Sequence, residues 1–176
     1  MESHTSHYFI ADLAIKGVQS FMKENPEVSA EEVAEVVVNQ QMASALKSHD
    51  KIRIFLRSVI TPNFFKNKEI QANSEIMSKI TQSNPIMERH LISTVEEICA
   101  GSTLEPKHFP VMLKLLFDEE ALSEDVILEW ACDGRSEFTN DGLDEDMRAN
   151  LRGQAEPVVL WLQEDSDSDD SDSDSD

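Results

Sequence analysis

The chain has 176 residues, of which 35 are acidic and 15 are basic, so its formal net charge is −20 at pH 7. Two cysteines without a motif exclude a disulfide framework, and no apolar run approaches the roughly 18 residues of a membrane-spanning helix. We therefore expect one folded domain of an intracellular, cytoplasmic protein with no membrane partner, in which Cys99 and Cys132 are reduced and mostly buried.

Apolar residues recur at three- and four-residue spacing with little strict alternation, a pattern that predicts an all-α fold. In chain order, we expect helices at residues 8–24, 29–46, 50–60, 68–81, 86–99, 106–117, 124–131 and 143–163. The first helix is expected to bury one face, which carries Phe9, Leu13, Val18 and Phe21. At the start of the second helix, Ser29 and Glu32 have the spacing of a capping box.

The connections between these helices are short, which favours antiparallel neighbours. Four helix pairs in about 160 residues approach the ~40 residues per unit of a HEAT-type repeat. We therefore expect a HEAT-like stack of about four antiparallel helix pairs at residues 8–163, after a flexible N-terminus at residues 1–7. Pro157 is expected to kink or restart the last helix. Residues 164–176 contain no apolar side chain and are expected to form a disordered Ser/Asp acidic tail.

A basic stretch lies at residues 47–68, where six basic residues accompany a single acidic one, Asp50. Phe55, Phe64 and Phe65 lie among them. Such a patch could bind RNA, an acidic protein surface or the acidic tail of the same chain, but a helix whose lysines extend from an apolar surface into water is the favoured explanation. The candidate residues are Lys47, Lys51, Arg53, Arg57, Lys66 and Lys68.

The segment LLFDEEALSEDVILEWACD, residues 115–133, contains seven acidic residues and no basic one. Asp125, Glu129 and Asp133 follow one another at four-residue spacing along the expected helix, where like charges repel by a few tenths of a kcal/mol per pair. Val126, Ile127 and Trp130 share another face. An acidic stripe that destabilises its own helix suggests a basic partner, whereas the simpler alternative is a solvated face.

A second segment joins an aromatic residue to acidic ones, EPVVLWLQED at residues 156–165. Met147, Leu151, Val158 and Leu162 have core spacing, which leaves Trp161 at the edge of the apolar stripe. Tryptophan is common in binding hot spots and is also common in cores, so the sequence leaves both roles open.

The negative charge is concentrated in the second half of the chain. Residues 1–100 contain 13 acidic and 10 basic residues, whereas residues 101–176 contain 22 and 5. A field of this sign attracts basic proteins and repels nucleic acid, which we expect at most as a secondary partner. In the tail, Ser166, Ser171 and Ser173 each have aspartate three residues later, the spacing that acidophilic kinases prefer, and phosphorylation would add further negative charge.

Motifs for catalysis are missing from the sequence. There is no glycine-rich phosphate loop, no nucleophile elbow and no CxxC pair, and the histidines have no carboxylate or cysteine at ligand spacing. We therefore expect a protein that is not an enzyme and that needs neither a metal nor another cofactor.

The two acidic segments resemble the aromatic-acidic boxes of the C-terminal HEAT-type domain of eukaryotic translation initiation factor 5. This domain is related to those of initiation factor 2B epsilon and the factor-5-mimic proteins. The match covers LLFDEEALSEDVILEW, residues 115–130 (the first box), and AEPVVLWLQEDSDSDD, residues 155–170 (the second box), in the family's order. Phe117 replaces the usual tyrosine of the first box, and Val158 replaces the usual phenylalanine of the second.

The resemblance implies a helical adaptor that binds the lysine-rich segments of the initiation factor 2 beta subunit, with initiation factors 1 and 3 and initiation factor 2B as further candidates. The positions that it assigns to partner binding are Phe117, Asp118, Glu119, Glu120, Glu124, Asp125, Glu129, Trp130, Glu156, Trp161, Leu162, Glu164 and Asp165. Three alternatives stay open: a guanine-nucleotide-exchange domain like that of factor 2B epsilon, a factor-5-mimic regulator, and an unrelated acidic chaperone of basic proteins.

Overall fold

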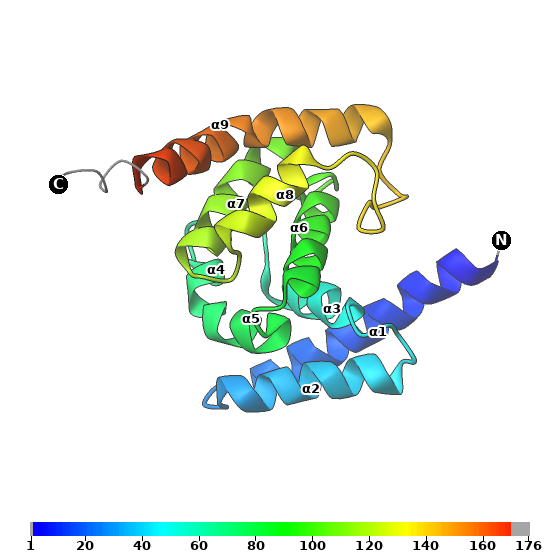
Figure 1. Cartoon of the computed structure of the whole chain (residues 1–176). Helices are drawn as coiled ribbons and strands as arrows, with labels where there is room; N and C mark the ends of the chain where they lie inside the picture. Colours follow the sequence, from blue (N-terminus) through cyan, green and yellow to red (C-terminus); the bar gives the residue numbers. More distant parts are fainter. Residues whose placement is uncertain (1, 170–176) are drawn as a thin grey trace.

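A computed structural model describes the backbone of residues 2–169 and the side chains of residues 9–168 (Figure 1). Over this range the chain is helical and has no strand, so the predicted all-α class is confirmed. The helices are α1 (Glu2–Glu24), α2 (Ala30–Ala43), α3 (Asp50–Val59), α4 (Glu69–Ala72), α5 (Ser74–Thr81), α6 (Pro85–Cys99), the 3-10 helix η1 (Pro106–His108), α7 (Phe109–Asp118), α8 (Glu124–Cys132) and α9 (Glu145–Asp169). None of the helices between residues 2 and 169 has the length and apolar character that a membrane crossing requires.

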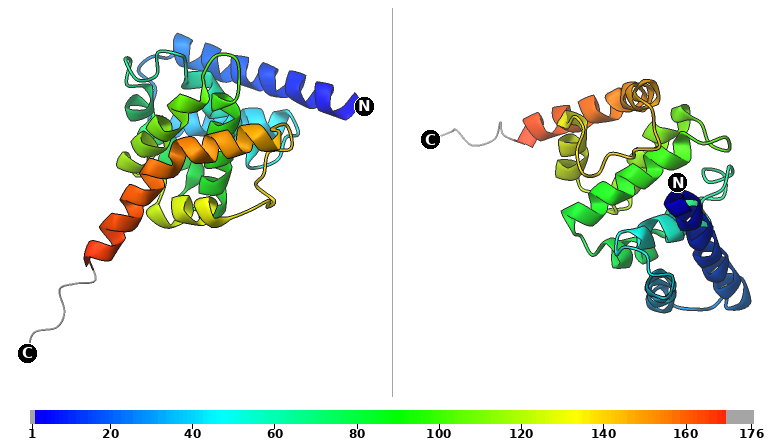
Figure 2. Two further views of the ribbon diagram at one scale, coloured as in Figure 1. Left: turned by 90° about the horizontal axis from the view of Figure 1, so that it is seen from above. Right: turned by 90° about the vertical axis from the view of Figure 1, so that its right-hand side faces the viewer.

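Successive helix pairs form the body of the molecule, as the sequence predicts. Helix α1 packs on α2 and α3, α2 on α5, and α3 on α6. Helix α6 then packs on α7 and α8, and α9 lies across both of these. Figure 1 shows α1 and α2 at one end of the stack and α9 at the other. The two further views in Figure 2 show that the first turns of α1 and the last turns of α9 project from this body.

Several helix boundaries differ from the expected ones; for example, α2 ends at residue 43 and not at residue 46. The expected helix at residues 68–81 is divided into α4 and α5 at Asn73, whose side-chain amide bonds the carbonyl of Glu69 and ends the first piece. Helix α1 begins at residue 2, within the segment expected to be flexible, and α9 continues through Pro157 to residue 169, beyond the expected end at residue 163. The predicted disorder of the remaining tail concerns residues 170–176, which lie outside the described range.

The buried face of α1 differs from the expected one. Phe9 and Leu13 are 64% and 53% exposed, so their expected place in the core is wrong. Val18 is fully buried and Phe21 packs against the core, as expected, whereas Ala11 and Ala14 are buried in place of Phe9 and Leu13. The physical reason is that a small residue such as Ala14 lets neighbouring helices approach closely, which two large side chains at the same place would prevent.

Two local predictions have different outcomes. The capping box of α2 is present, because the Ser29 hydroxyl accepts the N–H of Glu32 while the Glu32 carboxylate accepts the N–H of Ser29. Of the two thiols expected to be mostly buried, Cys99 is buried, and burial raises its pKa to about 12. Cys132 is exposed at the end of α8, so for this residue the expectation is wrong.

Candidate partner-binding surface

The fold brings the two boxes together into one surface. Helix α9 lies across α7 and α8, which carry the first box. The rings of Phe117 in the first box and Trp161 in the second meet edge to face, with 5.8 Å between their centroids. The Ser166 hydroxyl also contacts the carboxylate of Glu124. Segments about 40 residues apart in the sequence are therefore neighbours, as a shared binding surface requires.

Trp130 lies in the core beneath this surface and is 4% exposed. Its indole N–H donates a hydrogen bond of 3.1 Å to a carboxylate oxygen of buried Glu96, and its ring meets Phe109 edge to face at 5.4 Å. The Arg152 guanidinium of α9 lies 4.7 Å from the centre of the same ring and donates to the carbonyls of Trp130 and Ala131 at the end of α8. Trp130 thus joins α6, α8 and α9 and has little area left for a partner.

Trp161 lies at the surface and not in the core. It is 37% exposed, because its ring packs on Phe117 and on the ammonium group of Lys114 and is otherwise open to solvent. Next to it, Leu162 is buried whereas Leu160 is 50% exposed. Leu160 helps to line a hollow of about 390 Å³ between α8 and α9. Trp161 and Leu160 therefore provide exposed apolar area within the second box.

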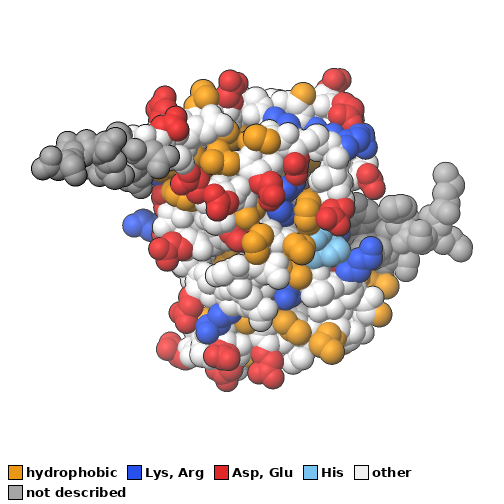
Figure 3. All heavy atoms as spheres, viewed as in Figure 1, with side chains coloured by type: hydrophobic (Ala, Val, Ile, Leu, Met, Phe, Trp, Pro, Cys, Tyr) orange, Lys and Arg blue, Asp and Glu red, His pale blue; other side chains and the backbone are white. Residues whose placement is uncertain are grey.

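Most carboxylates of the two boxes face solvent. The exposed residues are Asp118, Glu120, Asp125, Glu129, Glu156, Glu164 and Asp165, and the half-buried ones are Glu119 and Glu124. Figure 3 shows acidic and apolar side chains intermixed on the face over α7, α8 and α9. Of the three serines predicted to be phosphorylated, Ser166 is exposed, and the other two lie outside the described residues.

Two residues of the acidic stripe Asp125, Glu129 and Asp133 form ion pairs within the chain. The expectation that no basic residue offsets the repulsion along this stripe is therefore wrong. Arg89 of α6 is almost completely buried, and its guanidinium lies 2.7 Å from Asp133 and 3.5 Å from Glu129. Among the described residues, Asp125 has no ion pair. Of the three stripe residues, only Asp125 can thus bind a cation of a partner without breaking an ion pair with Arg89.

Sequence reasoning missed three residues that hold this surface in place. Arg89 and Arg152 anchor α8, and Phe138 of the loop at residues 133–144 packs its ring 4.7 Å from the Arg89 guanidinium. Arg148 and Arg152, four residues apart and beside apolar Leu151, were a usable signal, because two arginines at core spacing in an acidic helix indicate buried acidic partners. No comparable signal marks Phe138.

The turn between α7 and α8 holds Glu120 in the left-handed backbone region, with φ of 59°. Because glycine adopts this region without strain, we expect Glu120→Gly to raise the free energy of unfolding by about 0.5–1 kcal/mol in urea titrations. Glu119→Gly is the matched control, because it removes the same charge at a residue with φ of −90° and should lower stability. Equal effects of the two substitutions would contradict the role of backbone strain.

The basic patch is divided by the fold into two parts. Arg53 and Arg57 of α3 both bind Glu97 of α6, at 3.0 and 2.8 Å, and so connect two helices. The lysines of the patch make no ion pair with another described residue; Lys47, Lys66 and Lys68 are exposed, and Lys51 is half-buried. A partner would therefore meet the lysines and the exposed ring of Phe65, whereas the arginines serve the fold.

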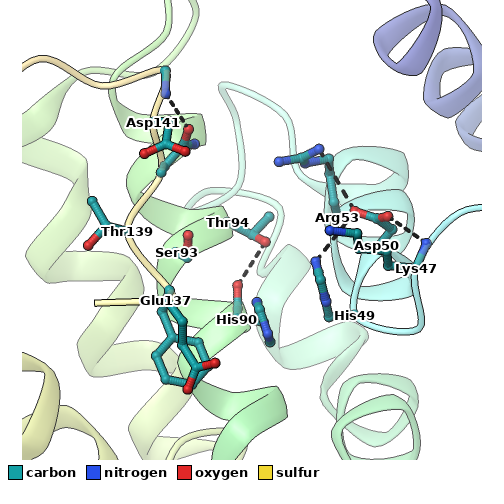
Figure 4. A pocket seen from close by; sticks show the side chains of 13 residues that line it. Lys47, His49, Asp50, Arg53, His90, Ser93, Thr94, Glu137, Thr139 and Asp141 are labelled. Atoms are coloured by element: carbon teal, nitrogen blue, oxygen red, sulfur yellow. Dashed lines mark hydrogen bonds and ion pairs between the residues drawn. The ribbon is translucent and has the colours of Figure 1, made fainter. Parts of the chain in front are cut away.

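A half-open cavity of about 480 Å³ lies between the start of α3, helix α6 and the loop at residues 133–144 (Figure 4). In it, the imidazoles of His49 and His90 stack at 3.9 Å with their planes 4° apart, and Phe138 meets His90 edge to face at 5.0 Å. Burial, and then the neighbouring His49, lowers the pKa of His90 to about 4. Among the described residues, no group of histidine, cysteine and acidic side chains could hold a metal ion.

This lowered pKa predicts acid sensitivity. The unfolded chain binds a proton at His90 near pH 6.5, whereas the folded chain does so only near pH 4, so the free energy of unfolding should fall as the pH decreases through this window. Urea titrations at about pH 7 and pH 5 should show a smaller pH dependence for His90→Gln than for the wild type. His108→Gln, the control, should retain the wild-type dependence, and a similar result for His90→Gln would exclude His90 as the cause.

Comparison with known proteins supports the fold and the resemblance to the C-terminal domain of initiation factor 5. A family model described as "W2: eIF4-gamma/eIF5/eIF2-epsilon" matches residues 87–172, a range that contains both boxes. Eukaryotic translation initiation factor 5 of Drosophila melanogaster is 31% identical over 99 residues, which are 54% of this chain and 20% of that protein. The chain thus spans about a fifth of the length of this relative.

The fold is also similar to that of a solved structure, "The C-terminal Domain of Translation Initiation Factor 5 at low pH". The match has a TM-score of 0.66 and covers 92% of this chain and 97% of the other. Because the two sequences are 16% identical, this likeness concerns the fold.

Proposed function

We propose that the chain is a cytoplasmic translation initiation adaptor that acts by binding other proteins, because residues 87–172 match the W2 family model. Its main partner in this proposal is the lysine-rich part of the initiation factor 2 beta subunit. Initiation factors 1 and 3 and initiation factor 2B are further candidate partners. The observation that carries the proposal is the union of the two acidic boxes in one surface through the contact of Phe117 with Trp161.

The character of this surface fits a lysine-rich segment. Exposed carboxylates on α8 and α9 attract ammonium groups, and the exposed parts of Trp161 and Leu160 can pack against the aliphatic stems of lysines. Exposed charges are screened beyond about 8 Å at physiological salt, so the affinity comes from many weak pairs at short range. Binding should therefore weaken steeply as the salt concentration rises.

Charge reversal tests the proposal. Replacement of Asp125, Glu164 and Asp165 by lysine should weaken binding to a lysine-rich peptide of the beta subunit by at least about tenfold in calorimetric titrations. All three side chains are exposed and form no ion pair with another described residue, so the fold should survive. Glu129 stays unchanged, because its reversal would place a lysine beside buried Arg89.

The control variant carries the same change of charge at the other end of the molecule. Glu24 at the end of α1, Glu27 in the loop that follows and Glu35 of α2 are all exposed, and Figure 3 also shows acidic side chains at this end of the molecule. Their replacement by lysine should weaken binding much less. An equal loss in both variants would indicate that only the net charge matters, and unchanged binding of the first variant would refute the proposed surface.

A further inference from the structure

One lysine of the chain lies where a lysine of a partner would be expected. Lys114 of α7 directs its ammonium group toward both boxes: Nζ lies 2.5 Å from Oδ1 of Asp118 and 4.5 Å from the centre of the Trp161 ring. The ring of Phe117 meets Trp161 edge to face and so helps to hold the indole in position. A carboxylate on one side and the face of an indole on the other are the two groups that stabilise an alkylammonium ion most directly.

We propose that Trp161 and Asp118 form an ammonium-binding subsite, that Lys114 occupies it in the free protein, and that a lysine side chain of the partner displaces Lys114 on binding. The inference deepens the proposed function and rests on it. The ligand class is a primary alkylammonium group at the end of a flexible chain, because such a group occupies the subsite in the structure.

The exposure of the three side chains makes this exchange feasible. The side chains of Lys114 and Asp118 are 38% and 44% exposed, and Trp161 is similarly open to solvent. Exposed ion pairs and exposed contacts of a cation with an aromatic ring hold only weakly, so Lys114 can leave without unfolding α7. Arg89 cannot be displaced in this way, because it is buried beneath the surface and could leave Glu129 and Asp133 only if α6 moved.

Displacement has a measurable consequence for affinity. As long as Lys114 occupies the subsite, a lysine of the partner must compete with it, so the apparent affinity is reduced by the fraction of molecules whose subsite is filled. A side chain at residue 114 that has no charge leaves the subsite permanently open. In the wild type, Lys114 would therefore favour partners with several lysines, because one of these can replace Lys114 while the others bind the remaining carboxylates.

The experiment compares Lys114→Met with the wild type in calorimetric titrations with an oligolysine peptide at fixed ionic strength. Methionine retains an aliphatic stem of similar length and removes the ammonium group. We expect Lys114→Met to bind the peptide about three- to tenfold more tightly than the wild type. The matched control is Lys107→Met, which changes the net charge equally at η1, where Lys107 lies 2.9 Å from Glu105. Its effect should stay below about twofold.

Trp161→Leu provides the second measurement, because it removes the aromatic face of the subsite. In this background, Lys114→Met should improve binding no more than Lys107→Met does. Equal gains from the two lysine substitutions in the wild-type background would overturn the inference and leave the proposed function intact. If neither the wild type nor Lys114→Met binds oligolysine, the proposed function fails, and the inference fails with it.

Discussion

Replacement of Trp130 by alanine is expected to lower the free energy of unfolding by about 3–5 kcal/mol. Trp130 is 4% exposed, so the substitution leaves a cavity between α6, α8 and α9. It also removes the hydrogen bond to Glu96 and the ring on which the Arg152 guanidinium rests. Urea-induced unfolding followed by circular dichroism measures this loss directly.

Trp161→Ala is the matched control, because it truncates the other tryptophan of the same surface. Since Trp161 is 37% exposed, we expect a loss of stability of about 1 kcal/mol and a folded protein. Binding of a lysine-rich peptide should weaken in this folded variant, whereas Trp130→Ala should lose binding only to the extent that it unfolds. Comparable losses of stability in the two variants would contradict the division into a core and a surface tryptophan.

The exposure of the two tryptophans follows from helical spacing, but their functions do not. Trp130 shares a face with Val126 and Ile127, and all three are buried. Trp161 lies at the edge of its apolar stripe and is correspondingly half-exposed. The match to the two boxes places both residues in binding segments without distinguishing them. Only the packing of α9 on α7 and α8 shows that one tryptophan supports the surface and the other forms part of it.

Ion pairs between distant segments could not be predicted from the sequence. Asp125, Glu129 and Asp133 look alike in the pattern, yet Arg89, which lies 40 residues before Glu129, binds two of them. In the same way, Glu97 binds both arginines of the basic patch. Local spacing determines which charges share a face of a helix, whereas the partner of each charge depends on the packing of α6 against its neighbours.

Helix positions were more predictable than helix faces. Apolar spacing and turn residues are local signals, so every expected range is largely helical, although residues 68–81 form two helices. The face of α1 was not predictable in this way, since large apolar residues such as Phe9 and Ile15 occur on more than one side of it. The division at Asn73 was missed for a related reason: a single asparagine amide that bonds a carbonyl four residues earlier ends the helix, and its orientation is not visible in the sequence.

Replacement of Glu96 by alanine is expected to cost about 3–5 kcal/mol of stability, as much as the loss of Trp130. Glu96 is 9% exposed and accepts the indole N–H of Trp130. Burial raises its pKa, while the Trp130 hydrogen bond and the charges of Arg152, Arg148 and Arg89 act in the opposite direction. Alanine would remove this buried anion from the surroundings of Arg152, which has no ion pair with another described residue, whereas Arg89 and Arg148 keep other acidic partners. Glu96→Gln, which keeps the shape and an acceptor, should cost less in the same urea titrations.

The origin of this loss can be separated from simple packing by a double substitution. If the cost of Glu96→Ala comes from uncompensated cations, Arg152→Met should destabilise the Glu96→Ala protein less than it destabilises the wild type, with a coupling of about 0.5–3 kcal/mol. Additive losses would instead mean that Glu96 stabilises the fold through its volume and its bond to Trp130 alone. The first outcome would explain why an acidic protein keeps arginines beneath its acidic surface: they fix α8 and α9 in position through Glu96, so that the exposed carboxylates above them face the solvent.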